Sequence, residues 1–191
     1  VVLLLALLWL TRLGRWIARG TPAVRESRRR RGYRALTRGL VAVAAGDGDD
    51  ARRLAKRAKS LIKGDQPLTL VLLAQAAQLA GDAKGAHQYF TQMLDSPDTE
   101  FLGLRGLIVE AERTGDKDTA LSLARRAEAL RPNTPWIMGT LFELETQQGL
   151  WADAHKTVVK SARKKLVEPG DARRRKAVVL LQQARQDEAA G

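Results

Sequence analysis

Apolar residues recur through the middle of the chain at the three- and four-residue spacing that places them on one face of an α-helix. Two successive examples are the runs Leu70, Leu73, Ala74, Ala77 and Leu104, Leu107, Ile108, Ala111. Such spacing predicts amphipathic helices that bury one face. Aromatic residues make up only 5% of the 191 residues, which also favours helices over a β-sandwich or barrel. The pattern therefore predicts an all-α protein.

The predicted helices repeat with a fixed period. A glycine follows the first helix of each unit, and an alanine comes five residues later. The glycines are Gly46, Gly81, Gly115 and Gly149, spaced 35, 34 and 34 residues apart, and the alanines are Ala51, Ala86, Ala120 and Ala154. An aspartate directly follows the first three glycines, as Asp47, Asp82 and Asp116, whereas Leu150 follows the fourth. This regularity predicts one structural unit repeated four times.

Each part of the unit has a physical role. The glycine ends the first helix, where the backbone needs a left-handed residue. The aspartate caps the free amides of the second helix and meets the positive end of its dipole. The small alanine lets the two helices approach closely. Each unit is therefore expected to be a helical hairpin of about 34 residues.

The unit resembles the tetratricopeptide repeat. Phe90 fits the aromatic position of its second helix, and Leu130-Arg131-Pro132 matches its terminal proline, whereas Ile108, Phe142 and Trp151 depart from its pattern. The resemblance implies a superhelix of four repeats over residues 32–168, with residues 169–191 as the first helix of a truncated fifth repeat. Stacked repeats share one continuous core and form a concave groove.

The amino-terminal segment is predicted to be part of a transmembrane helix over residues 1–18, followed by an Arg-rich juxtamembrane linker over residues 19–31. Residues 1–10 have no polar side chain, and basic residues follow them rather than precede them. The membrane-proximal residues are Trp9, Arg12, Arg15, Trp16, Arg19, Arg28, Arg29, Arg30 and Arg31. Arginines after the apolar run predict that the repeats face the cytoplasm. An interfacial helix and an ordinary core helix are the alternatives.

The net charge of +12 lies mainly at the two ends of the chain. Residues 1–38 carry ten arginines and one acid, residues 39–159 carry 14 basic and 16 acidic side chains, and residues 160–191 carry nine basic and four acidic ones. A basic cluster beside an apolar run favours a membrane anchor over nucleic-acid binding. No nucleic-acid partner is expected.

Nothing in the sequence predicts an enzyme. Cysteine is absent, which excludes thiolate catalysis and Cys-ligated metal sites. No metalloprotease, phosphate-loop or nucleophile-elbow motif occurs. His87 and His155 are two periods apart and are expected on helix surfaces, not in a shared metal or haem site. Residues 46–50 contain three aspartates, a feature also found in calcium-binding loops, but the glutamate at the twelfth position of an EF-hand loop is missing.

First-helix side chains that point away from the second helix are expected to line the groove. They are Gln75, Gln78, Arg105, Glu112, Arg113, Trp136, Glu143 and Gln147. Solvation of a helix face is the alternative explanation for each of them. The set lacks the Lys/Asn array with which chaperone-binding repeats hold a terminal carboxylate, so that function is not expected.

Five segments resemble the HemY family of proteobacterial inner-membrane proteins. They are residues 31–40 (RGYRALTRGL), 67–70 (PLTL), 74–78 (AQAAQ), 99–107 (TEFLGLRGL) and 173–178 (RRRKAV). The resemblance implies a non-catalytic role in haem biosynthesis at the bacterial inner membrane, with late haem-pathway enzymes as partners. It does not imply protoporphyrinogen oxidase, a flavoprotein, because no dinucleotide-binding fingerprint is present. Two alternatives remain open: a carrier that binds haem or porphyrin, and an envelope adaptor unrelated to haem.

Overall fold

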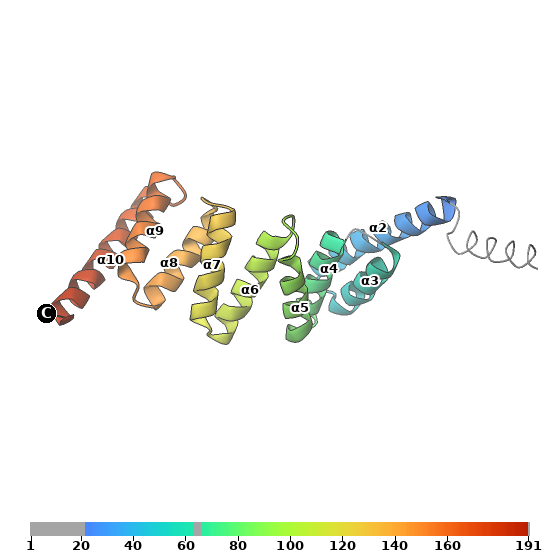
Figure 1. Ribbon diagram of the computed structural model, residues 1–191, viewed down its shortest axis with the longest axis horizontal. Helices are drawn as coiled ribbons and strands as arrows, with labels where there is room; N and C mark the ends of the chain where they lie inside the picture. The colour runs from blue at the N-terminus through green and yellow to red at the C-terminus, as the bar shows by residue number, and fades with distance from the viewer. Residues whose placement is uncertain (1–21, 63–65, 191) are drawn as a thin grey trace, which may run out of the picture. The chain divides into compact units, whose positions relative to one another are not determined.

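The computed structural model describes residues 22–62 and 66–190, and within these ranges every regular element is an α-helix (Figure 1). The helices are α2 (Pro22–Ala44), α3 (Gly48–Leu61), α4 (Gln66–Leu79), α5 (Ala83–Met93), α6 (Glu100–Thr114), α7 (Lys117–Leu130), α8 (Pro135–Gln147), α9 (Trp151–Arg163) and α10 (Pro169–Ala190). The predicted all-α fold of helical hairpins is confirmed. The chain divides into two compact units between Ala86 and His87, inside α5.

The four periodic glycines end four first helices in the same way. Gly46, Gly81, Gly115 and Gly149 all have a left-handed backbone, with φ of 78°, 71°, 77° and 70°. At each turn the amide after the glycine donates to the carbonyl five residues earlier, as from Asp47 to Ala42 over 2.9 Å and from Leu150 to Glu145 over 2.8 Å. This bond defines the Schellman motif and satisfies carbonyls that the helix end leaves open.

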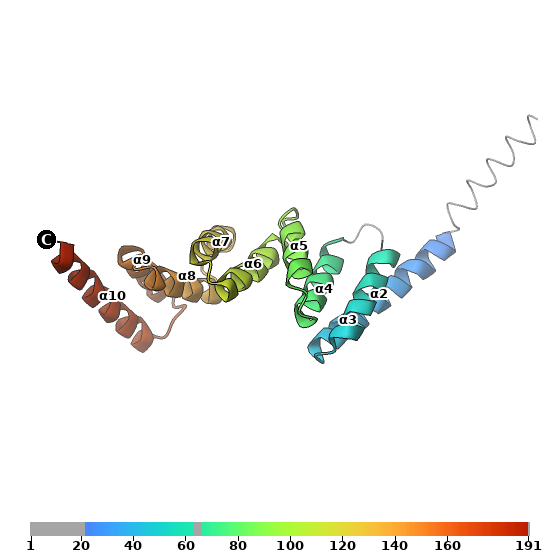
Figure 2. The ribbon, with the colours of Figure 1, turned by 90° about the horizontal axis from the view of Figure 1, so that it is seen from below.

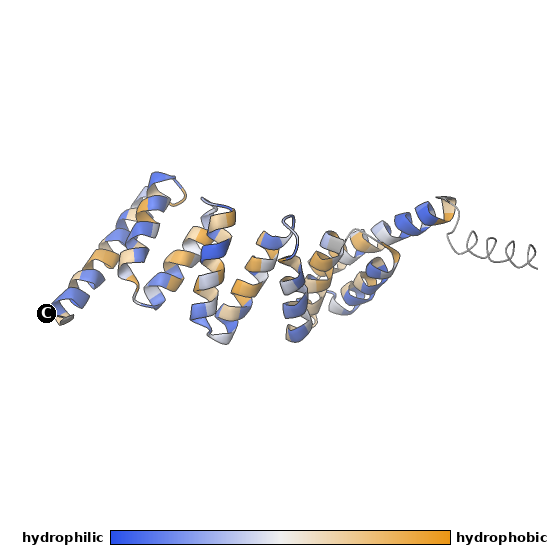
Figure 3. Cartoon of the chain, viewed as in Figure 1, coloured by the Kyte–Doolittle hydropathy of each residue, from blue (hydrophilic) through white to orange (hydrophobic). Residues whose placement is uncertain are grey.

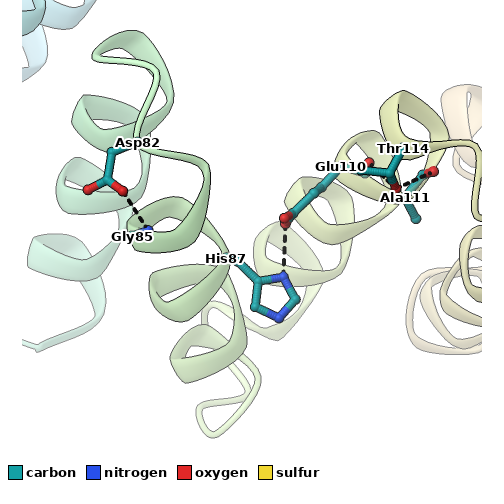
Figure 4. Close-up of polar contacts among 6 residues, drawn as sticks. All are labelled: Asp82, Gly85, His87, Glu110, Ala111 and Thr114. Carbon is teal, nitrogen blue, oxygen red and sulfur yellow. Dashed lines mark hydrogen bonds and ion pairs between the residues drawn. The ribbon is translucent and has the colours of Figure 1, made fainter.

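The aspartates after the first three glycines act as caps. Asp47 accepts a hydrogen bond from the Asp50 amide over 2.9 Å, and Asp116 accepts one from the Thr119 amide over 3.0 Å. Asp82 accepts a bond of 2.9 Å from the Gly85 amide (Figure 4). Leu150 makes no side-chain cap. The four alanines that follow are buried, with at most 4% of their surface exposed, as a close helix contact requires.

In the amino-terminal unit, α2 packs along α3, and α4 packs against both (Figure 2). A Cβ atom at Gly32 would lie 2.5 Å from Cγ1 of Ile62, which follows α3. This close packing extends toward the start of α2, and residues 22–31, expected as part of a linker, are helical. Among the described residues, the first helix thus includes this Arg-rich segment as well as residues of the first predicted repeat.

The carboxy-terminal unit has one apolar core across α6, α7 and α8. Leu104, Ile108, Ile137 and Leu144 are each at most 1% exposed within it. Ile108 is accommodated there although the repeat pattern prefers a small residue at that position. Farther along, α9 packs on α8, and α10 packs on α9. Helix α10 continues past Gln183, one period after Gly149, to Ala190.

None of the described helices is long and apolar enough to cross a bilayer. Residues 1–18, for which a transmembrane helix is predicted, lie outside the described ranges. Trp9, Arg12, Arg15, Trp16 and Arg19 lie outside them too, so the predicted membrane helix stays a prediction.

Replacing Gly106 with alanine should destabilise the carboxy-terminal unit. A Cβ atom there would overlap the ring of Phe90, which is 6% exposed. Overpacking of this kind costs about 1–3 kcal/mol, and the better helix propensity of alanine offsets about 0.5–1 kcal/mol. We expect the free energy of unfolding, measured by chemical denaturation, to fall by the difference.

Gly139→Ala is the matched control, because nothing lies within 4 Å of a Cβ atom at Gly139 in α8. It should stabilise the protein by about 0.5–1 kcal/mol. Equal stability of the two variants would show that Phe90 does not pack on α6 as described.

Candidate functional site

Two predicted groove residues of the carboxy-terminal unit meet at the surface of α6 and α8. The guanidinium carbon of Arg105, an exposed residue of α6, lies 5.2 Å from the ring centroid of Trp136 in α8. The Trp136 ring also meets Phe101 edge-on, with centroids 5.7 Å apart and an angle of 61° between the planes. Arg131 lies over the other aromatic ring, 5.0 Å from the Phe101 centroid. The four side chains contact one another in the order Arg105, Trp136, Phe101, Arg131, with the two rings between the two cations. We call this group the Arg–aromatic stack.

The repeat geometry assembles this stack. Phe101 and Arg105 are one helical turn apart at the start of α6, so their side chains share a face. Helix α7 runs back along α6, and its C-cap residue is Arg131. Trp136 follows Pro135 at the start of α8, where proline suits the first helical turn. The beginnings of α6 and α8 and the end of α7 therefore come together.

An acidic pair lies two helical turns farther along the same two helices. Glu112 follows Arg105 by seven residues, and Glu143 follows Trp136 by seven, which is about 10 Å at the rise of an α-helix. Partial burial raises the pKa of the Glu112 carboxyl above its ordinary value, and the negative charge of Glu143 raises it further. The surface thus has an Arg–aromatic end and an acidic end.

The other predicted groove residues are not part of these contacts. Arg113 and Gln147 are exposed at the ends of α6 and α8. Gln75 and Gln78 belong to α4 in the amino-terminal unit, where Gln75 is half-buried and Gln78 is exposed. A continuous groove lined by all eight residues stays a prediction.

Sequence reasoning missed Phe101 and Arg131. Phe101 precedes Arg105 by one helical turn, a spacing that could have placed it on the same face. By sequence, Arg131 marks only the end of a repeat. Its side chain reaches the first-helix surface because α7 ends beside the start of α6, a contact between elements that sequence periodicity does not encode.

Glu145 is a buried acid that the sequence did not reveal. It is 5% exposed in α8, at the position that Ala111 occupies one period earlier. Burial raises its pKa, and a hydrogen bond from Thr157 opposes that rise. Its Oε2 atom has no hydrogen-bond partner among the described residues. Glu145 lines a small cavity with Thr157 and the basic residues Arg125, Lys156 and Lys160.

The two histidines have different surroundings. His87 is exposed in α5, and its Nδ1 atom lies 3.0 Å from Oε2 of Glu110 in α6 (Figure 4). His155 in α9 is half-buried, and its Nε2 atom has no hydrogen-bond partner within the described ranges. The described residues contain no group of three or more acidic or histidine side chains that could hold a metal ion.

Replacing Glu143 with glutamine should lower the pKa of Glu112 toward its ordinary value, because one negative charge beside that carboxyl is removed. A residual elevation should remain, since burial is the larger cause. The carboxyl carbon of Glu112 can be followed by NMR through a pH titration.

Glu110→Gln is the control, because Glu110 lies on the same helix but contacts His87. It should leave the pKa of Glu112 nearly unchanged. If Glu143→Gln also left it unchanged, the two carboxyls would not share one surface.

Comparison with known proteins supports both the fold and the family resemblance. Residues 1–81 match the family model described as HemY protein N-terminus. The crystal structure of a thermophilic tetratricopeptide-repeat protein from Thermus thermophilus superposes with a TM-score of 0.50 at 22% sequence identity. That match covers 83% of this chain and 86% of the Thermus protein, and at this identity it shows the fold alone.

No curated protein matches the chain significantly. The match over residues 1–81 includes α2, α3 and α4, which form most of the described amino-terminal unit. The structural match extends over most of the chain. The amino-terminal part of the chain is therefore similar to the HemY amino terminus, and the fold is of the tetratricopeptide-repeat type.

Proposed function

We propose that this chain is a non-catalytic, membrane-anchored scaffold that binds protein partners and supports late haem biosynthesis at the bacterial inner membrane. The observation that carries the binding role is the Arg–aromatic stack on the surface of α6 and α8. Helical repeats of this type generally mediate protein–protein interaction. The resemblance to HemY is the reason for proposing haem biosynthesis as the pathway.

The stack has the properties of an interaction hot spot. Tryptophan and arginine are over-represented among residues that carry binding energy. Each ring of the stack has a cation over it, so the side chains are ordered before a partner arrives and less entropy is lost on binding. Trp136 is half-buried against the core and still reaches the surface.

The acidic pair adds a preference for charge. A lysine or arginine of the partner placed between Glu112 and Glu143 would relieve the repulsion that raises the pKa of Glu112. The partner segment is therefore expected to be basic at one end. Its other end would meet the Arg–aromatic stack with aromatic or acidic side chains, about 10 Å away.

Membrane anchoring would help the scaffold to work. A transmembrane helix over residues 1–18 would hold four repeats at the cytoplasmic face of the membrane. Confinement to a surface raises the local concentration of each bound partner. A scaffold can in this way speed a sequence of reactions that it does not catalyse.

Trp136→Ala should abolish the capture of partners from solubilised membranes. Loss of a hot-spot tryptophan costs about 2 kcal/mol or more, which weakens binding about 30-fold. The matched control is Trp151→Ala, which removes another half-buried tryptophan from α9. Affinity purification with quantitative mass spectrometry measures the partners, and circular dichroism checks that both variants fold.

The outcomes separate the parts of the proposal. Partners lost in Trp136→Ala and kept in Trp151→Ala support binding at α6 and α8, and retention in both variants contradicts it. Recovery of late haem-pathway enzymes, with altered porphyrin levels in a deletion strain, supports the haem role. Recovery of unrelated envelope proteins, with normal porphyrin levels in the deletion strain, would support the alternative of a general envelope adaptor.

A further inference from the structure

The hairpin of α2 and α3 carries an unusual amount of positive charge. Its two helices hold twelve arginine and lysine residues and only three acids, Glu26, Asp49 and Asp50, a formal charge of +9. The basic residues are Arg25, Arg28, Arg29, Arg30, Arg31, Arg34, Arg38, Arg52, Arg53, Lys56, Arg57 and Lys59. All twelve are exposed. The whole chain has a formal charge of +12, so this hairpin carries most of the net charge.

The packing of the two helices gathers this charge at one end. Arg28 donates a hydrogen bond of 2.8 Å from Nη2 to the carbonyl of Ser60, in the last turn of α3. The arginine-rich beginning of α2 therefore lies beside the end of α3, which adds Lys56, Arg57 and Lys59. We call this the basic end of the hairpin. Figure 3 shows the hydrophilic character of this part of α2.

The three acids of the hairpin neutralise only a small part of its positive charge. Asp49 and Asp50 lie in the first turn of α3, at the opposite end, and Asp50 forms an ion pair with Arg53. Glu26 pairs with Arg30 over 2.9 Å. Arg29 lies over the Tyr33 ring, 5.6 Å from its centroid. Most of the positive charge thus remains in excess, and clustered like charges repel one another unless an anion is bound.

The neighbouring sequence and the low aromatic content of the hairpin favour an anionic lipid surface as the binding partner. The sequence before α2 begins with ten apolar residues, so the basic end is close along the chain to a segment suited to lipid. Tyr33 is the only aromatic residue of the hairpin, whereas single-stranded nucleic acids are usually held by several stacking rings. Clustered basic residues of this kind bind anionic headgroups at a membrane surface.

We propose that the basic end of the α2–α3 hairpin is a docking surface for the phosphate groups of an anionic bilayer, with Lys56 and Arg57 of α3 as part of it. The second helix thus contributes to membrane contact together with the arginines of the first. This inference shares the membrane location of the proposed function but does not depend on partner binding at α6 and α8.

The test uses the full chain reconstituted into phosphatidylcholine vesicles, with and without about 30% phosphatidylglycerol. Because the chain has no cysteine, Ser60→Cys and Ala45→Cys each introduce one site for a fluorophore. Ser60 lies at the basic end and Ala45 at the opposite turn, and both are exposed. A quencher on the lipid headgroups then reports which end approaches the bilayer.

In the vesicles that contain phosphatidylglycerol, we expect strong quenching at the Ser60 label and weak quenching at the Ala45 label. In pure phosphatidylcholine vesicles, we expect no such difference between the two labels. Each basic side chain near the lipid contributes about fivefold to binding, so Lys56→Gln with Arg57→Gln should weaken docking about 25-fold. Lys176→Gln with Arg185→Gln is the matched control, because it removes two exposed basic residues of α10. That pair should leave the quenching unchanged.

Three results would overturn the proposal: equal quenching of the two labels, quenching that does not depend on phosphatidylglycerol, or no effect of the α3 substitutions. A fourth would be protection of the Ser60 label by duplex DNA but not by anionic vesicles, which would assign the surface to nucleic acid. Partner capture is measured separately, so a failure here is distinguishable from a failure of the scaffold role.

Discussion

A left-handed glycine at the end of a first helix is the constraint on which the rest of the structure depends. At Gly46, Gly81, Gly115 and Gly149 the backbone reverses with a positive φ, which a side chain with a Cβ atom rarely adopts. The reversal sends the second helix back along the first and brings a small alanine into their contact. Because the turn recurs about every 34 residues, successive first helices present equivalent positions.

This regularity explains why two helices can build one surface. In the carboxy-terminal unit, α7 occupies the return path, so the starts of α6 and α8 come together beside its end. Arg105, Trp136, Phe101 and Arg131 then stack in order. The same parallel arrangement brings Glu112 near enough to Glu143 for the two charges to interact. The turns determine how the helices pack against each other, and side chains outside the core determine the chemistry of the surface.

Much of the fold could be predicted from the sequence, because its turns require particular residue types. Glycine, aspartate and alanine at fixed offsets identified the ends of the helices, and the structure shows the expected backbone and caps. The limits of α2 and α10 were harder to predict. Residues 22–31 look like a basic linker by composition, but the packing of Gly32 against Ile62 shows that α2 lies on α3 near this point. In α10, Gln183 stands where the period would place the next glycine, and the helix continues past it.

The candidate site was predictable in part. Repeat phase found Arg105, Glu112, Trp136 and Glu143, since positions on one helix face follow from spacing. It did not find Arg131, whose role depends on where α7 ends relative to α6. It also missed Glu145, because a buried acid occupies a position that Ala111 fills in the preceding repeat. Contacts between elements, rather than periodicity, determine these residues.

The most direct test of a partner-binding surface on α6 and α8 is in-cell photocrosslinking from single positions. A photoreactive amino acid would replace Arg105 on α6, Glu143 on α8 or, as a control, Val159, which is 42% exposed on α9. Capture of the same protein from both first-helix positions and not from Val159 is the predicted result. Capture from Val159 alone would contradict it and would place the interaction on the second helices.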